Sequence, residues 1–187
     1  MNLNLCRGPE ASGSRLDQFT DGPIHLFDLE ATQALGTELA QRLPTGAILL
    51  LKGPLGAGKT SLVQGIALAL GVYEPITSPT SALAQHYTDG NPPLIHLDLY
   101  RLEQPSAADD IFLQEDEEAR AIGALMAVEW PERLSLSLPE AWLLQLSHTN
   151  DGCRSAQLTP PRNVSTCLLY TSPSPRDVEE SRMPSSA

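Results

Sequence analysis

The sequence of 187 residues is poor in lysine, with only Lys52 and Lys59. Lys and Arg together number 12 against 23 acidic residues, which gives a formal net charge of −11 at pH 7. This balance argues against a protein that holds nucleic acid through its own global charge. No apolar run approaches the roughly 18–20 residues of a membrane span, and residues 1–22 lack the features of a secretory signal. We therefore expect a cytoplasmic protein without a membrane anchor.

Cysteine is also scarce. The three cysteines, Cys6, Cys153 and Cys167, look unpaired and have no metal-binding or redox spacing, which argues against a disulfide scaffold. The length fits one α/β domain that is large enough to bury a proper core.

The composition changes abruptly near the C-terminal end. Residues 167–187 are rich in Ser and Pro and show no helical or strand periodicity, which is typical of a disordered tail. The stretch that begins CLLYTSPSPRD resembles a translated transposase-type sequencing adapter. We therefore expect a flexible segment over 1–22, one domain over 23–160 and a disordered tail over 161–187, of which 167–187 is artefactual.

Hydrophobic periodicity predicts strands that alternate with helices. Residues 28–43 carry apolar positions close to a 3.6-residue repeat, with Asp28 as the N-cap. Residues 47–52 form a continuous apolar run of the kind found in a buried parallel strand. We expect an α/β fold with a mostly parallel central sheet, flanked by helices, and a C-terminal antiparallel hairpin. The other expected strands lie at 23–27, 82–87, 93–102, 124–130 and within 142–159, and the other helices at 61–71 and 107–122.

One segment has the pattern of a phosphate-binding loop. GPLGAGKT, which starts at Gly53, matches G-x-x-x-x-G-K-[ST], follows an apolar strand and opens a helix. Gly53, Gly56 and Gly58 let the backbone wrap closely, so that several N–H groups can point at phosphate oxygens. Lys59 supplies a charge for the β- and γ-phosphates, and the Thr60 hydroxyl can ligate Mg²⁺. With both flanks correct, a chance glycine-rich turn is strongly disfavoured.

The scarcity of lysine bears on the nucleotide. Guanine-specific P-loop GTPases read the base with an Asn/Thr-Lys-x-Asp segment. Lys52 is followed by Gly-Pro and Lys59 by Thr-Ser, so neither can serve in this way. The sequence therefore favours an adenine nucleotide.

Two carboxylates stand where apolar strands are expected to end. Asp98 closes LIHLD and Glu129 closes LMAVE. Carboxylates at the C-terminal ends of strands face the ligand crevice of an open α/β sheet, where one of them can hold Mg²⁺ or polarise water. Either could also be an ordinary acidic residue at a strand end, but a P-loop in the same sheet favours the ligand role.

Several other residues have two interpretations. An acidic cluster within 107–122 is typical of a solvated helix face, with a docking surface for a basic partner as the alternative. His86 and His96 lie in strand patterns and are expected to be structural rather than metal ligands. Trp130 either packs or contacts a partner, whereas Trp142 is expected in the core. The cluster comprises Asp109, Asp110, Glu115, Asp116, Glu117 and Glu118.

Four segments, taken in order, resemble the TsaE (YjeE) family. They are GPLGAGKTS, SPT, HLDLYRL and VEWPERL, and they span about 23–158, essentially the whole expected domain. The family is the bacterial ATPase needed for threonylcarbamoyladenosine in tRNA. The resemblance therefore implies a P-loop NTPase-like fold, with ATP and Mg²⁺ as cofactors and a weak, partner-dependent ATPase activity.

The resemblance also implies roles for individual residues. Gly56 to Ser61, with Ala57 among them, would bind the ATP phosphates, and Thr60 with Glu129 would coordinate Mg²⁺. Asp98 would match the acid that the family requires in H-x-D-x-Y-R, beside Lys59 and Glu129 in the catalytic set.

Three further positions are implied as switch or partner residues. Ser78 and Thr80, in the SPT segment, resemble a switch-like loop near the γ-phosphate. Trp130 matches the Glu-Trp pair of the family.

The implied partner is a TsaB–TsaD-type complex, in which TsaD transfers the threonylcarbamoyl group. ATP hydrolysis would reset that complex between turnovers, and tRNA would be met only indirectly, through a partner. Two alternatives stay open. One is a small-molecule or nucleoside kinase, although arginines are sparse after the P-loop, with Arg101 the one close to a site motif. The other is a nucleotide-binding regulatory module without turnover.

Overall fold

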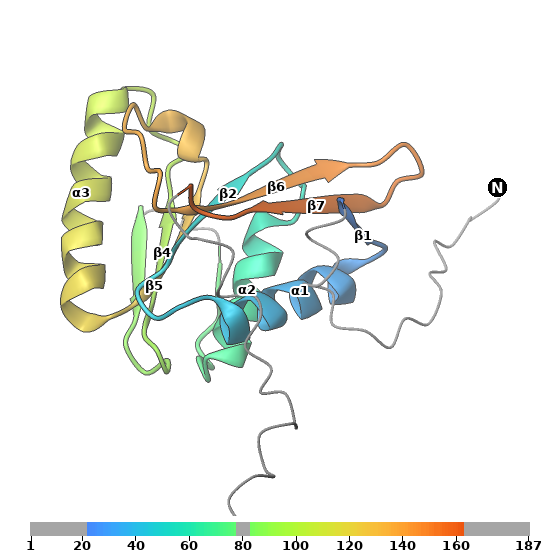
Figure 1. Cartoon of the computed structure of the whole chain (residues 1–187), viewed down its shortest axis with the longest axis horizontal. Coiled ribbons are helices and arrows are strands. Elements are labelled where there is room, and N and C mark those ends of the chain that lie inside the picture. The colour runs from blue at the N-terminus through green and yellow to red at the C-terminus, as the bar shows by residue number, and fades with distance from the viewer. Residues whose placement is uncertain (1–21, 78–82, 163–187) are drawn as a thin grey trace, which may run out of the picture.

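The computed structural model describes residues 22–77 and 83–162. The expected flexible segment at 1–22 and the expected tail at 161–187 lie almost wholly outside the described residues. The helices and strands form one sheet with helices on both faces (Figure 1). In chain order they are β1 (Ile24–Leu26), α1 (Leu29–Arg42), β2 (Ile48–Lys52), α2 (Lys59–Ala69), β3 (Ala84–Tyr87), β4 (Leu94–Asp98), α3 (Pro105–Ile122), β5 (Leu125–Glu129), the 3₁₀ turn η2 (Pro131–Arg133), β6 (Trp142–His148) and β7 (Arg154–Thr159).

The sheet has seven strands in the order β1-β7-β6-β2-β5-β4-β3. Its centre is parallel, since β2 pairs in parallel with both β5 and β6, and β4 pairs in parallel with β5. Both edges are antiparallel, through β3–β4 on one side and β6–β7–β1 on the other. The predicted α/β fold, with a parallel centre and a C-terminal hairpin, is therefore confirmed.

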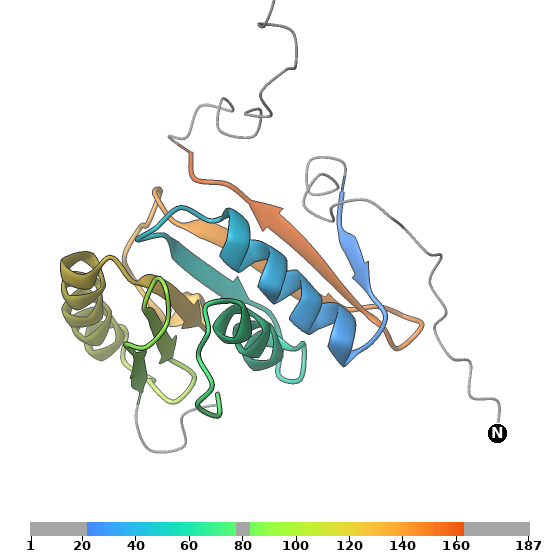
Figure 2. The same ribbon diagram turned by 90° about the horizontal axis from the view of Figure 1, so that it is seen from below.

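The side chains of β2 alternate between two cores. Leu49 and Leu51 lie in a cluster with residues of α1 and α2, such as Leu35. Ile48 lies in a second cluster with Phe112 of α3. Viewed from below, α1 and α2 lie side by side under one face of the sheet (Figure 2). Because β2 is covered on both faces, its continuous apolar run is explained.

The helix boundaries follow from local chemistry. Asp28 is the N-cap of α1, as predicted, and its side chain accepts a hydrogen bond of 2.7 Å from the N–H of Ala31. The helix α2 begins at Lys59, directly after the P-loop, and the chain leaves it through Gly71 in the left-handed region.

The contact between α1 and α2 depends on glycine. A Cβ built on Gly65 of α2 would overlap the backbone carbonyl oxygen of Gln33 in α1, and one built on Gly36 of α1 would overlap that of Leu62. The two helices therefore approach more closely than any residue with a side chain would allow. This approach sets the position of α2, and with it the N-terminus that follows the P-loop.

Two expectations need correction. Glu115 was expected on a solvated face, but its side chain is buried and pairs with His86 of β3, because that side of α3 packs toward the edge of the sheet. Cys153, which looked unpaired in the sequence, is disulfide-bonded. Cysteine pairing follows from tertiary proximity, which spacing in the sequence does not reveal. No helix among the described residues is long and apolar enough to cross a membrane.

Replacing Gly65 with alanine should destabilise the protein by about 3 kcal/mol, because the new Cβ must push α2 away from α1. Alanine is intrinsically the better helix former by about 1 kcal/mol, so a loss must come from the contact. Gly71→Ala is the matched control: it forces a left-handed alanine at a cost of about 1 kcal/mol, with no atom within 4 Å of its Cβ. Urea unfolding measures both, and equal losses would contradict the packing argument.

Candidate functional site

A pocket lies where β2, β4 and β5 end and α2 begins. Its volume is about 240 Å³. The carboxyl ends of parallel strands are where ligands bind in open α/β sheets. The lining residues are Leu55, Gly56, Gly58, Lys59, Thr60, Ser61, Asp98, Tyr100, Glu129, Trp130 and Arg154.

The P-loop connects β2 to α2 in the conformation that its glycines permit. Gly58, the N-cap of α2, has φ 99° in the left-handed region, where a side chain would be strained. A Cβ at Gly58 would also crowd the side chain of Thr32 and would touch that of Arg154. Two features of this loop suit a phosphate: the glycine positions, where no side chain covers the backbone, and the first N–H groups of α2.

Lys59 is buried, and its amine is held by the loop itself. Its Nζ donates hydrogen bonds to the backbone oxygens of Gly53 at 2.7 Å and Pro54 at 3.0 Å. Burial lowers the pKa of Lys59 below its ordinary value, and the nearby carboxylates of Glu129, Glu132 and Asp98 counteract part of this shift. The loop thus positions a desolvated cation near acidic side chains, two of which are the carboxylates that the sequence singled out.

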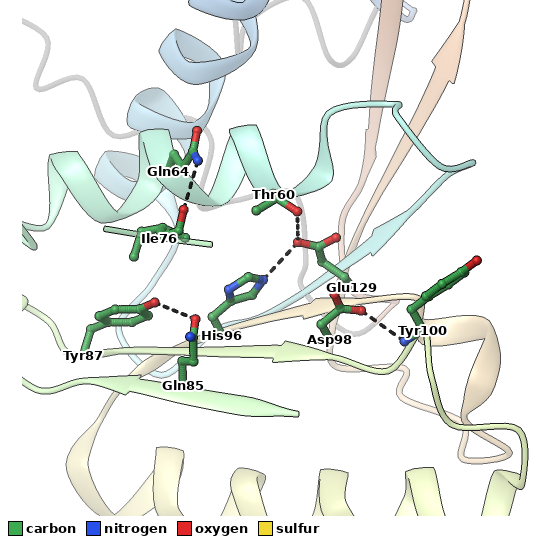
Figure 3. A network of polar contacts seen from close by, with 9 residues as sticks. All are labelled: Thr60, Gln64, Ile76, Gln85, Tyr87, His96, Asp98, Tyr100 and Glu129. Carbon is green, nitrogen blue, oxygen red and sulfur yellow. Dashed lines mark hydrogen bonds and ion pairs between the residues drawn. The ribbon is translucent and has the colours of Figure 1, made fainter. Parts of the chain in front are cut away.

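Glu129, the last residue of β5, is at the centre of a buried network (Figure 3). Its Oε1 accepts a hydrogen bond of 2.8 Å from the Thr60 hydroxyl, and the same oxygen lies 3.0 Å from Nε2 of His96. Because a carboxylate accepts, the His96 Nε2 carries the hydrogen. The predicted Mg²⁺-ligating pair of Thr60 and Glu129 is therefore in direct contact.

His96 differs in one respect from the structural histidine that was expected. It is fully buried, and within the described residues its Nδ1 has no hydrogen-bond partner. His96 lies on the neighbouring strand β4, and its Nε2 holds the Glu129 carboxylate by a hydrogen bond.

Asp98 lies beside Glu129, because the parallel register of β4 and β5 pairs these two residues. Its side chain is 7% exposed, and its Oδ1 accepts a hydrogen bond of 3.0 Å from the N–H of Tyr100. Figure 3 shows the two carboxylates at the ends of adjacent strands. Two carboxylates and one buried lysine thus face one pocket.

Trp130 turns back over the P-loop. Its backbone is left-handed at φ 60°, the one non-glycine residue with positive φ among the described residues. The Nζ of Lys59 lies 3.9 Å from the centre of its ring, which is a cation–π contact. Tyr100 packs against it with ring centroids 4.8 Å apart. Unusual backbone conformations concentrate at functional sites, and this one directs Trp130 into the pocket.

The sequence did not point to Arg154. In the sequence, Arg101 is the arginine close to a site motif, but in the structure Arg154 of β7 lines the pocket. No local pattern marks Arg154, because the C-terminal hairpin brings it to the P-loop from 98 positions away along the chain. Tyr100 was likewise unassigned, although it belongs to the H-x-D-x-Y-R segment.

The structure brings together most of the predicted site residues, but not all. Gly56, Gly58, Lys59, Thr60, Ser61, Asp98, Glu129 and Trp130 line the pocket. Gly53 and Ala57 do not: the Gly53 carbonyl oxygen accepts a hydrogen bond from Lys59, and the Ala57 side chain is fully buried. Ser78 and Thr80 lie outside the described residues.

The donor set fits a phosphorylated ligand with Mg²⁺. Magnesium prefers oxygen ligands, commonly one or two carboxylates completed by phosphates and water, and Thr60 and Glu129 supply such oxygens. Over residues 22–77 and 83–162, no group of three or more His, Cys, Asp or Glu side chains could hold a metal by itself. The hollow is smaller than the roughly 300–1,000 Å³ typical of small-molecule sites. A nucleotide would therefore fill this pocket with only part of its length, and the rest would extend outside it.

Comparison with known proteins agrees with the geometry. The family model described as "Threonylcarbamoyl adenosine biosynthesis protein TsaE" matches residues 26–156. The chain belongs to the TsaE family. The match includes β2 to β6, the P-loop and every residue that lines the pocket, Arg154 among them.

Two curated relatives carry the name tRNA threonylcarbamoyladenosine biosynthesis protein TsaE. The one from Nostoc sp. is 42% identical over 157 residues, covering 83% of this chain and 95% of its own length. The one from Synechocystis sp. is 48% identical over 119 residues, covering 58% of this chain and 69% of its own length. Among solved structures, Bacillus subtilis YdiB is similar in fold, with a TM-score of 0.60 at 24% identity over 79% of this chain and 90% of that one.

The contact between His96 and Glu129 can be measured by a double-mutant cycle of His96→Leu and Glu129→Gln. Each replacement keeps a similar side-chain volume and removes one half of the buried pair. We expect a coupling energy of about 1–3 kcal/mol in the free energy of unfolding, because the two groups compensate each other's burial. Additive losses would show that His96 fills space without supporting the carboxylate. A cycle of Arg120→Ala and Asp116→Ala, an exposed pair on α3, should couple by less than about 1 kcal/mol.

Proposed function

We propose that this TsaE-family protein binds and hydrolyses ATP with Mg²⁺ and is required for the threonylcarbamoyladenosine modification of tRNA. It would act on a TsaB–TsaD-type complex to support the turnover of that complex. The observation that carries the proposal is the convergence of the P-loop residues Lys59 and Thr60 with Glu129 and Asp98 in one pocket.

The chemistry follows from the residues around the pocket. The N–H groups at the start of α2 and the amine of Lys59 would bind the phosphate chain and offset its negative charge. Mg²⁺, when bound, would stabilise the charge that develops on the transferred phosphoryl group. Thr60 and Glu129 are the residues that would hold the ion. Asp98, beside Glu129, would orient the attacking water.

Partner dependence fits the charge of the chain. With a net charge of −11, a surface that binds tRNA directly is not expected. The relatives are named for tRNA threonylcarbamoyladenosine biosynthesis, and an acidic ATPase in that process would meet tRNA through a partner. A cytoplasmic location is part of the proposal.

Replacing Lys59 with alanine should weaken ATP binding by about a hundredfold, because it removes a charge-assisted hydrogen bond worth roughly 1.5–3 kcal/mol. Calorimetric titration with ATP and Mg²⁺ measures the affinity. Lys52→Ala removes the other lysine, whose side chain is exposed and does not line the pocket, and should bind as the unchanged protein does. Unchanged affinity in Lys59→Ala would rule out this pocket as the ATP site.

ATP hydrolysis should be slow for the isolated protein and faster when purified TsaB and TsaD are added. Phosphate release with and without the pair measures this directly. Glu129→Gln should lower the stimulated rate at least tenfold, since it removes the carboxylate that would hold Mg²⁺, while Arg120→Ala should leave the rate unchanged. No stimulation, together with phosphate transfer to a small acceptor, would favour the kinase alternative over the proposed function.

A further inference from the structure

The C-terminal hairpin reaches the P-loop through a cross-strand pair. His148 at the end of β6 and Arg154 at the start of β7 are directly opposite each other in the antiparallel register. Arg154 donates a hydrogen bond of 3.3 Å from its Nε to the backbone oxygen of Gly56, and Nε2 of His148 lies 3.4 Å from the backbone oxygen of Leu55. Side chains from one end of the hairpin thus contact the backbone oxygens of two consecutive P-loop residues, Leu55 and Gly56.

Arg154 is also one of two basic side chains that line the described pocket, and the other is Lys59. Their surroundings differ. The Lys59 amine is held by two loop carbonyls and stands near Asp98 and Glu129. Arg154 is half-buried on the side of the P-loop that faces β7, with its side chain packed near Gly58. The pocket therefore has two cations, one from the P-loop itself and one from the hairpin.

The guanidinium has capacity beyond its bond to the loop. Arginine carries five N–H donors in a planar fork, and the bond to Gly56 uses the Nε–H. The two terminal nitrogens can still form the paired hydrogen bonds that arginine makes with phosphate. A brace for the backbone alone would need only a neutral donor.

We propose that Arg154 is a phosphate-binding residue of this pocket, which pairs with the phosphate chain of the nucleotide and anchors the C-terminal hairpin to it. The proposal rests on the proposed function in that it takes the ligand to be a nucleotide. It adds a cation that lies outside the P-loop motif. The hairpin thereby becomes part of the binding site rather than an edge of the sheet.

The test measures binding of ADP and of inorganic tripolyphosphate by calorimetry, for the full chain, three variants of Arg154 and one control variant. Arg154→Ala should lower the affinity for both probes by about tenfold or more, because a charged hydrogen bond is lost. Arg154→Lys should retain part of the affinity, since it keeps the charge. Arg154→Gln keeps a neutral donor for Gly56 but should bind as weakly as the alanine variant.

Several outcomes overturn the inference. If Arg154→Gln binds both probes like the unchanged protein, the residue is only a brace for the loop. If ADP affinity falls while tripolyphosphate affinity does not, Arg154 contacts the nucleoside rather than the phosphates. Arg120→Ala removes a distant, exposed arginine from α3 and should leave both affinities unchanged. If Arg120→Ala lowers both affinities as much as Arg154→Ala does, the loss follows from the change in net charge and not from a contact made by Arg154.

The inference and the proposed function fail separately. Weak binding by Lys59→Ala with unchanged binding by every Arg154 variant leaves the proposed function in place and removes the inference. If Arg154→Gln loses affinity for tripolyphosphate but the unchanged protein does not hydrolyse ATP even with TsaB and TsaD added, the inference stands and the proposed function fails. Thermal unfolding without ligand verifies folding. If Arg154→Ala does not fold, the affinities of Arg154→Lys and Arg154→Gln are compared with that of the unchanged protein instead.

Discussion

The site depends on the position of β2 at the centre of the parallel sheet. This strand is paired on both sides, and its register places Leu51 opposite Glu129 of β5. It then runs through the P-loop directly into α2. Because α2 is held against α1 by a glycine contact that admits no side chain, neither end of the P-loop can shift independently. The distance from Thr60 to Glu129 follows from these two constraints.

The pocket is built from charges that compensate one another in a partly dry environment. Lys59, Asp98 and Glu129 are each less than 10% exposed, and His96 is fully buried. Isolated burial of any of these charges would be costly. Hydrogen bonds from Thr60 and His96 to one oxygen of Glu129 reduce that cost and hold the carboxylate in one orientation. A prearranged charge pattern of this kind is what phosphoryl transfer requires.

The predictable residues are those whose role is carried by a local pattern. The P-loop, the N-cap Asp28 and the strand-end carboxylates could be recognised because their neighbours in the sequence create their environment. Glu115 was misjudged for the opposite reason: its neighbours on α3 are acidic, yet its own side of the helix packs toward His86. Arg154 was missed because no motif near it in the sequence indicates that it lines this pocket.

The sequence by itself determined the order of strands and helices, the P-loop and the family, since periodicity and motif are properties of short segments. Only the tertiary structure decided which groups share the pocket. Strand register brought Asp98 beside Glu129, the left-handed turn at Trp130 laid its ring over Lys59, and the hairpin carried Arg154 to Gly56. Each of these contacts joins residues far apart in the chain. Their meeting therefore depends on how the whole sheet pairs and packs, which no local pattern records.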